Sequence, residues 1–92
     1  RRACPPHEGE EMSFERAAMR GRLAELQDKK AKLRFKAEGL CTAIRQGLNT
    51  TLTPVEEIEM AIVAQQMDDL VMAYAELQGF LGDIARLEKE LR

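Results

Sequence analysis

The sequence predicts an all-α protein, in which two long antiparallel helices form a coiled-coil-like hairpin and two hairpins join as a four-helix bundle. Three observations predict this class. Good helix formers dominate the 92 residues, with only three prolines and six glycines among them. Apolar residues recur every three or four positions along two long segments. A single short stretch of turn-forming residues separates those segments.

Residues 1–12 show no apolar periodicity and contain two adjacent prolines, so we expect a disordered or extension tail. Met12 directly precedes the first good helix cap and is a candidate start of the native protein. Cys4 and His7 supply half of the ligands of a structural zinc site, and no second such pair follows them. We therefore expect neither a metal nor another cofactor.

The first helix is predicted over residues 14–48, with Ser13 as its N-cap. Four of the five d positions of its heptads carry large apolar residues, which is typical of a coiled coil. The a positions are Arg16, Leu23, Lys30, Ala37 and Ile44, and the d positions are Met19, Leu26, Leu33, Leu40 and Gly47. At about 1.5 Å per residue this helix is a rod about 50 Å long.

A turn is predicted over residues 49–53, because Gly47 and Asn49 both accept the left-handed conformation that ends helices. Thr53 is then a good N-cap, and Pro54 suits the first helical position. Glu56 completes a capping box with the Thr53 amide. These signals predict a second helix over residues 54–91, antiparallel to the first because the connection is short.

The two helices should meet along one apolar seam. With the turn centred near residue 51, the numbers of facing residues sum to about 102, so Leu33 lies near Met67 and Leu70. The predicted seam consists of Met19, Leu23, Leu26, Leu33, Leu40, Ile44, Met60, Val63, Met67, Leu70, Tyr74, Leu77, Leu81 and Ile84.

Apolar residues remain outside this seam, which predicts a homodimer. The candidate dimer face consists of Phe35, Ile58, Ile62, Ala73 and Phe80. A second interpretation concerns Met60, Met67 and Met72, which could form an adaptable groove for a partner helix rather than fill the seam. A larger protein partner also remains open.

Residues 29–36, KKAKLRFK, carry five Lys or Arg in eight positions. The first helical segment (13–48) holds nine basic and four acidic residues, and the second (53–92) holds three and nine. We therefore interpret the basic run as one flank of a charged seam that faces Asp68 and Asp69. The alternative is nucleic-acid contact through Lys32, Arg34 and Lys36, although a formal net charge of −2 does not favour it.

Catalysis is not expected. The single His lies in the tail, and no glycine-rich phosphate loop occurs. Cys41, at an e position beside the seam, is expected to be a small buried apolar residue. No apolar run approaches the length of a membrane span, and the two cysteines do not form a disulfide framework, so we expect a cytoplasmic protein.

The segments MSFERAAMRGRLAELQDKKAKLRFKAEGL and TPVEEIEMAIVAQQMDDLVMAYAELQ resemble small helical-hairpin proteins of Mu-like bacterial prophages. The resemblance covers residues 12 to 92 and implies a phage-related structural or regulatory role, with no activity assigned to any residue. Two functions therefore remain: a self-associating structural or interaction module, and a small nucleic-acid-binding or regulatory protein.

Overall fold

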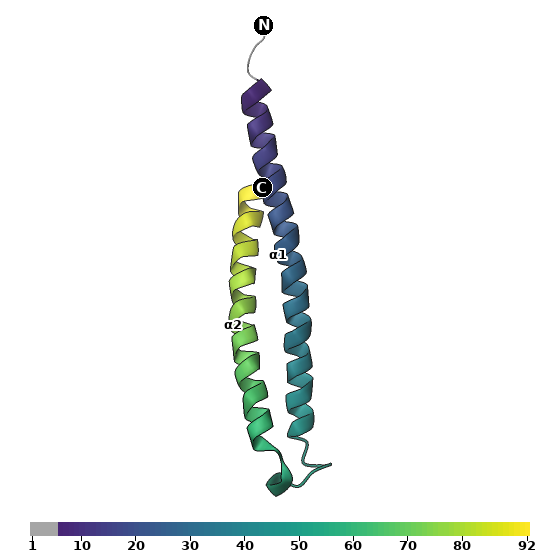
Figure 1. Ribbon diagram of the computed structural model, residues 1–92. Helices are drawn as coiled ribbons and strands as arrows, with labels where there is room; N and C mark the ends of the chain where they lie inside the picture. The colour runs from purple at the N-terminus through teal and green to yellow at the C-terminus, as the bar shows by residue number, and fades with distance from the viewer. Residues whose placement is uncertain (1–5) are drawn as a thin grey trace.

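A computed structural model describes residues 6–92, with side chains from residue 14 onward. Two long helices lie side by side and are joined by a turn at one end (Figure 1). Helix α1 spans Pro6–Gly47, the short 3-10 helix η1 spans Val55–Glu57, and helix α2 spans Met60–Leu91. The molecule is a rod of 82 × 17 × 16 Å. The predicted all-helical hairpin is confirmed, with no strand in the described residues.

Helix α1 begins at Pro6 rather than at residue 14, so the prediction of a tail is wrong for residues 6–12. Proline suits the first turn of a helix because the amide hydrogen that it lacks has no partner there. The C-terminal end at Gly47 agrees with the predicted end to within one residue. Residues 1–5, including Cys4, lie outside the described part of the chain.

The side of α1 that faces α2 carries the predicted a and d residues. Partial burial recurs at intervals of three and four residues, at Met19, Leu23, Leu26, Lys30, Leu33, Ala37, Leu40, Ile44 and Gly47. At the other end of the hairpin, Nη2 of Arg16 donates a hydrogen bond of 2.7 Å to the carbonyl oxygen of Leu91. A cation suits the carbonyl end of a helix. Beyond this point α1 extends past the end of α2 (Figure 1).

Asn49 organises the turn. Its side-chain oxygen accepts a hydrogen bond of 3.0 Å from the backbone N–H of Thr51 and another from the Thr51 hydroxyl. Its carbonyl oxygen accepts from the backbone N–H of Thr53 at 3.2 Å. This local pairing gives the N–H groups of Thr51 and Thr53 hydrogen-bond partners in a segment that belongs to no helix.

The predicted start of the second helix at Pro54 is wrong. Residues 55–57 make only one 3-10 turn, and Ile58 then adopts an extended conformation, so α2 begins at Met60. No side-chain cap hydrogen bond forms at either helix start, and the predicted capping box of Thr53 and Glu56 is therefore absent. Because Ile58 is extended, its half-buried side chain lies in a hollow that Gly47 and Val63 also line.

The longer connection shifts the register of the hairpin. Leu33 and Phe80 line one hollow, and Leu26 and Leu87 line another. The numbers of facing residues therefore sum to 113 rather than to about 102 in this part of the hairpin. The predicted pairing of Leu33 with Met67 and Leu70 is wrong because the turn is centred several residues later than expected.

Helix α2 faces α1 with one row that repeats at alternating intervals of three and four. We call it the seam row, and it consists of Val63, Gln66, Leu70, Ala73, Leu77, Phe80, Ile84, Leu87 and Leu91. Four predicted seam residues are in it, but four others are exposed, namely Met60, Met67, Tyr74 and Leu81. Ala73 and Phe80, which were predicted to face a second copy, lie in the seam row instead.

The core between the helices is thin. In the part of the chain with described side chains, only Val63, Ala73 and Ile84 are buried, with 4–9% of their surface exposed. Two helices meet along a single line and cannot enclose a side chain on all sides. Packing within one hairpin therefore leaves most of each helix in contact with solvent.

Candidate interaction surface

Helix α2 carries a second apolar row outside the seam. We call it the outer row, and it consists of Met60, Ala64, Met67, Val71, Tyr74, Gln78, Leu81 and Ala85. From Ala64 onward each member directly follows a member of the seam row, so the outer row lies about 100° around the helix from the seam. Its five large side chains, with Met60 and Val71 among them, are 40–60% exposed.

The surroundings of the outer row are nearly free of charge. Between residues 60 and 82 the only charged residues are Asp68, Asp69 and Glu76. Met72, about 100° farther around the helix than Val71, is 72% exposed, and Gly79 and Gly82 are exposed as well. The solvent-facing side of a surface helix normally carries charged residues. An exposed, uncharged helix face of this length is typical of a protein interaction site.

Helix α1 has no equivalent of this row. The residues that follow its seam residues are Arg20, Ala24, Gln27, Ala31, Arg34, Glu38, Cys41, Arg45 and Leu48. Four of these nine are charged, so α1 is apolar on one face only. Phe35 is 79% exposed but is isolated, with Lys36 and Arg34 as its chain neighbours. The only extended apolar surface of the described hairpin therefore belongs to α2.

The opposite flank of the hairpin is charged on both helices. Lys29, Lys32 and Lys36 line a hollow together with Glu76. Arg22 lines a second hollow with Asp83 and Glu90. The basic side of α1 thus faces acidic residues of α2, but these are not the predicted Asp68 and Asp69, because the register differs.

Ion pairs in the described structure form within single helices. Nζ of Lys32 lies 3.1 Å from Oδ2 of Asp28, and Nη2 of Arg86 lies 2.7 Å from Oδ1 of Asp83. Exposed pairs of this kind contribute about 0–1 kcal/mol each. Charge across the flank therefore favours one orientation of the helices and adds little stability.

The three residues of the nucleic-acid alternative do not form one patch. Lys32 pairs with Asp28, and Nε of Arg34 lies 3.6 Å from Oε2 of Glu38. Two residues correspond to about 200° on a helix, so Arg34 lies on the opposite side of α1 from Lys32. Lys36 shares its hollow with Glu76. The structure thus brings Lys32 and Lys36 together and separates Arg34 from them.

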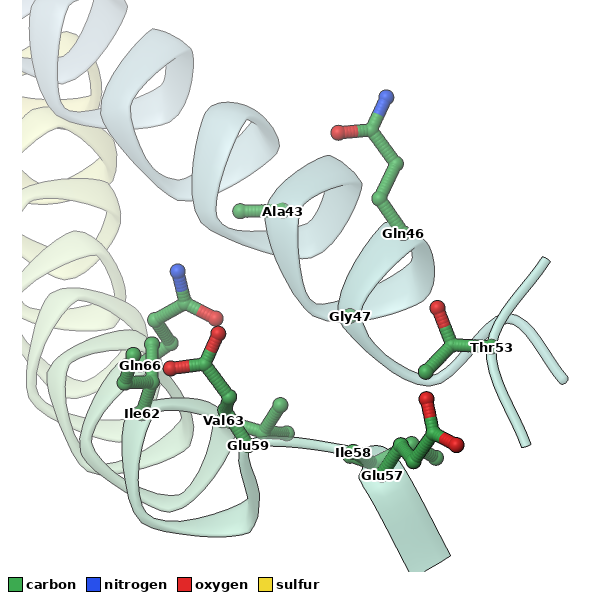
Figure 2. A pocket seen from close by; sticks show the side chains of 10 residues that line it. All are labelled: Ala43, Gln46, Gly47, Thr53, Glu57, Ile58, Glu59, Ile62, Val63 and Gln66. Carbon is green, nitrogen blue, oxygen red and sulfur yellow. The ribbon is translucent and has the colours of Figure 1, made fainter. Parts of the chain in front are cut away.

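A hollow of about 220 Å³ lies at the turn, between the end of α1 and the start of α2 (Figure 2). Its lining combines the apolar Ile58 and Val63 with the carboxylates of Glu57 and Glu59. Gly47 closes it from α1, where an added Cβ would lie only 2.9 Å from Cγ2 of Val63. The hollow therefore results from close helix packing around a glycine.

Other chemistry has few candidates among the residues that the structure describes. No three His, Cys, Asp or Glu side chains there come together as metal ligands. Cys41 is a free, exposed thiol, which corrects the expectation that it is buried. The Cys4–His7 pair is not placed, because Cys4 lies outside the described residues. Neither described helix is long and apolar enough to cross a membrane.

The predicted dimer face is dispersed over the hairpin. Ala73 and Phe80 pack in the seam row, and Ile58 lines the hollow at the turn. Ile62 is half-exposed beside the same hollow, and Phe35 is alone on α1. The interpretation of Met60, Met67 and Met72 as an adaptable surface fits their exposed positions, whereas the assignment of Met60 and Met67 to the seam does not.

No known protein family, curated protein or solved structure matches this chain. The resemblance to prophage hairpin proteins therefore remains a prediction.

Proposed function

We propose that this protein is a non-enzymatic interaction module, a helical hairpin that self-associates as a homodimer with four helices. The observation that carries the proposal is the large surface of a single hairpin. The chain exposes 7199 Å², whereas a compact monomer of the same mass exposes about 5,400 Å². The excess is about 1,800 Å² per chain, and part of it belongs to the length of α1 that extends past α2 (Figure 1). Two chains together have enough excess for the roughly 2,000–5,000 Å² that obligate dimers bury.

The thin core supports the same proposal. Single cores in chains of this size supply about 3–5 kcal/mol at most. Among the residues with described side chains, only Val63, Ala73 and Ile84 are buried, so a second hairpin would supply the packing that the first one lacks. An adjacent pair of hairpins is the usual way in which such helices complete a four-helix core.

Sedimentation equilibrium of the native chain at micromolar concentration tests the proposal. We expect a mass of about twice that of the 10.4 kDa chain. A well-folded monomer that melts cooperatively would contradict self-association.

The second candidate function is nucleic-acid binding by α1, favoured by the excess of basic over acidic residues between residues 13 and 48. Fluorescence anisotropy with a labelled DNA duplex separates the two functions. Phosphate contacts release counterions, so true binding weakens steeply as salt rises. We expect no binding in about 150 mM salt, where neighbouring acids already neutralise the basic run. Sub-micromolar binding with a steep salt dependence would favour the second function.

A further inference from the structure

We propose that the dimer forms through the outer row of α2, which packs antiparallel against the outer row of a second copy. The two-fold axis passes between Val71 and Tyr74, at the middle of the row. This inference rests on the self-association proposed above and specifies the surface and the symmetry that produce it.

The angle between the two rows of α2 is the first argument. A helix that packs against two neighbours in a bundle meets them in roughly perpendicular directions. The seam row and the outer row differ by one residue step, about 100° around the helix. Helix α2 can therefore pack against α1 through one row and against another helix through the next. Helix α1 has one apolar row, so it packs against α2 alone and lies at the periphery of the proposed dimer.

The order of large and small residues in the outer row is the second argument. Antiparallel pairing about the middle of the row brings together residues whose numbers sum to 145. The facing pairs are Met60 with Ala85, Ala64 with Leu81, Met67 with Gln78, and Val71 with Tyr74. Two large side chains thus face alanines. Parallel pairing would instead place each methionine against its own copy and each alanine against alanine, which packs less evenly.

Charge also permits this contact. Asp69 and Glu76 precede Val71 and Gln78 by two residues, about 200° around the helix. These carboxylates therefore lie on the far side of α2 from the outer row, and Glu76 shares a hollow with three lysines of α1. Asp68 lies three residues before Val71 and therefore flanks the outer row. Antiparallel pairing offsets the two copies of Asp68 by nine residues, about 13 Å along the axis, so these two carboxylates do not meet. A second copy of the chain can therefore cover the outer row, and the contact needs no partner of opposite charge.

The position of the two turns tests the symmetry. A spin label at Thr51→Cys, with Cys4 and Cys41 replaced by Ser, reports the distance between turns by double electron–electron resonance. Helix α2 rises about 1.5 Å per residue, so antiparallel pairing places the two starts of α2 about 38 Å apart, with the turns beyond them at opposite ends of the dimer. A distance below about 30 Å would mean that both turns lie at the same end, and it would overturn the antiparallel arrangement.

A matched pair of variants tests the surface. Val71→Glu introduces a charge at the proposed axis, whereas Phe35→Glu introduces one at an isolated apolar residue of α1 that is more exposed than Val71. Sedimentation equilibrium should show at least a tenfold weaker dimer for Val71→Glu and an unchanged dimer for Phe35→Glu.

The outcomes separate this inference from the proposed function. A native chain that sediments as a monomer would overturn both. A native dimer that survives Val71→Glu, or that Phe35→Glu dissociates, would leave self-association in place and overturn the assignment to the outer row. If Val71→Glu unfolds the hairpin, the spin-label distance decides.

Discussion

Gly47 lies at the end of α1, where the backbone faces the stiff, buried side chain of Val63. We predict that Gly47→Ala lowers the melting temperature, because the new Cβ would lie 2.9 Å from Cγ2 of Val63. Overpacking costs about 1–3 kcal/mol, which exceeds the gain of at most about 1 kcal/mol in helix propensity. Gly39→Ala is the control, because no atom lies within 4 Å of its added Cβ. Thermal unfolding should show a higher melting temperature for this control, and equal responses would contradict the prediction.

Asn49 makes the side-chain hydrogen bonds of the turn, whereas the Thr53–Glu56 pair, which the sequence predicts to cap the second helix, makes no cap hydrogen bond. We predict that Asn49→Ala lowers the free energy of unfolding by about 1 kcal/mol, because it removes the acceptor for the Thr51 amide and hydroxyl.

The double variant Thr53→Ala and Glu56→Ala should unfold like the native chain, since neither helix start has a side-chain cap hydrogen bond. A clear loss of stability in the double variant would show that α2 starts at Pro54 after all.

At the scale of the element, the two helices differ in how well the sequence predicts their faces. Leu26, Leu33 and Leu40 are separated by charged residues on α1, so only one face can be apolar and the prediction of that face agrees with the structure. Helix α2 has two apolar rows one residue apart, and periodicity alone does not tell which row meets α1. The row that meets α1 includes Gln66 and Ala73, whereas the sequence favoured the neighbouring row because Met67 and Tyr74 have larger side chains.

The start of the second helix was the other source of error in the predicted fold. A strong local capping signal at Thr53 predicts an early helix start, but the chain forms a 3-10 turn and an extended residue before Met60. Local signals report the preference of a few residues, whereas packing of Ile58 in the hollow depends on contacts distant in sequence. The later start of α2 accounts for the error in register, whereas the exchange of seam and surface residues came from the choice between the two apolar rows of α2.

Ala73 tests which row of α2 meets α1. It is 4% exposed, whereas Ala75 on the same helix is exposed. We predict that Ala73→Leu destabilises the hairpin by about 1–3 kcal/mol, because the added carbons have no space between the helices. Ala75→Leu should change the free energy of unfolding by less than about 0.5 kcal/mol. Chemical denaturation measures both, and a tolerated Ala73→Leu would contradict the observed phase of α2.

At the scale of the whole molecule, folding and association should be one event. A single hairpin has a thin core, so the second copy supplies a large part of the buried surface, and unfolding then depends on protein concentration. We predict that a hundredfold increase in concentration, equivalent to about 2.7 kcal/mol, raises the melting temperature by about 5–10 °C. Adding about 1 M salt should have a much smaller effect, because the outer row is uncharged and the ion pairs are exposed. Circular dichroism in cells of different path length measures both responses. A cooperative transition at the same temperature across the whole concentration range would show that the hairpin folds alone, and that the outer row is not needed for its stability.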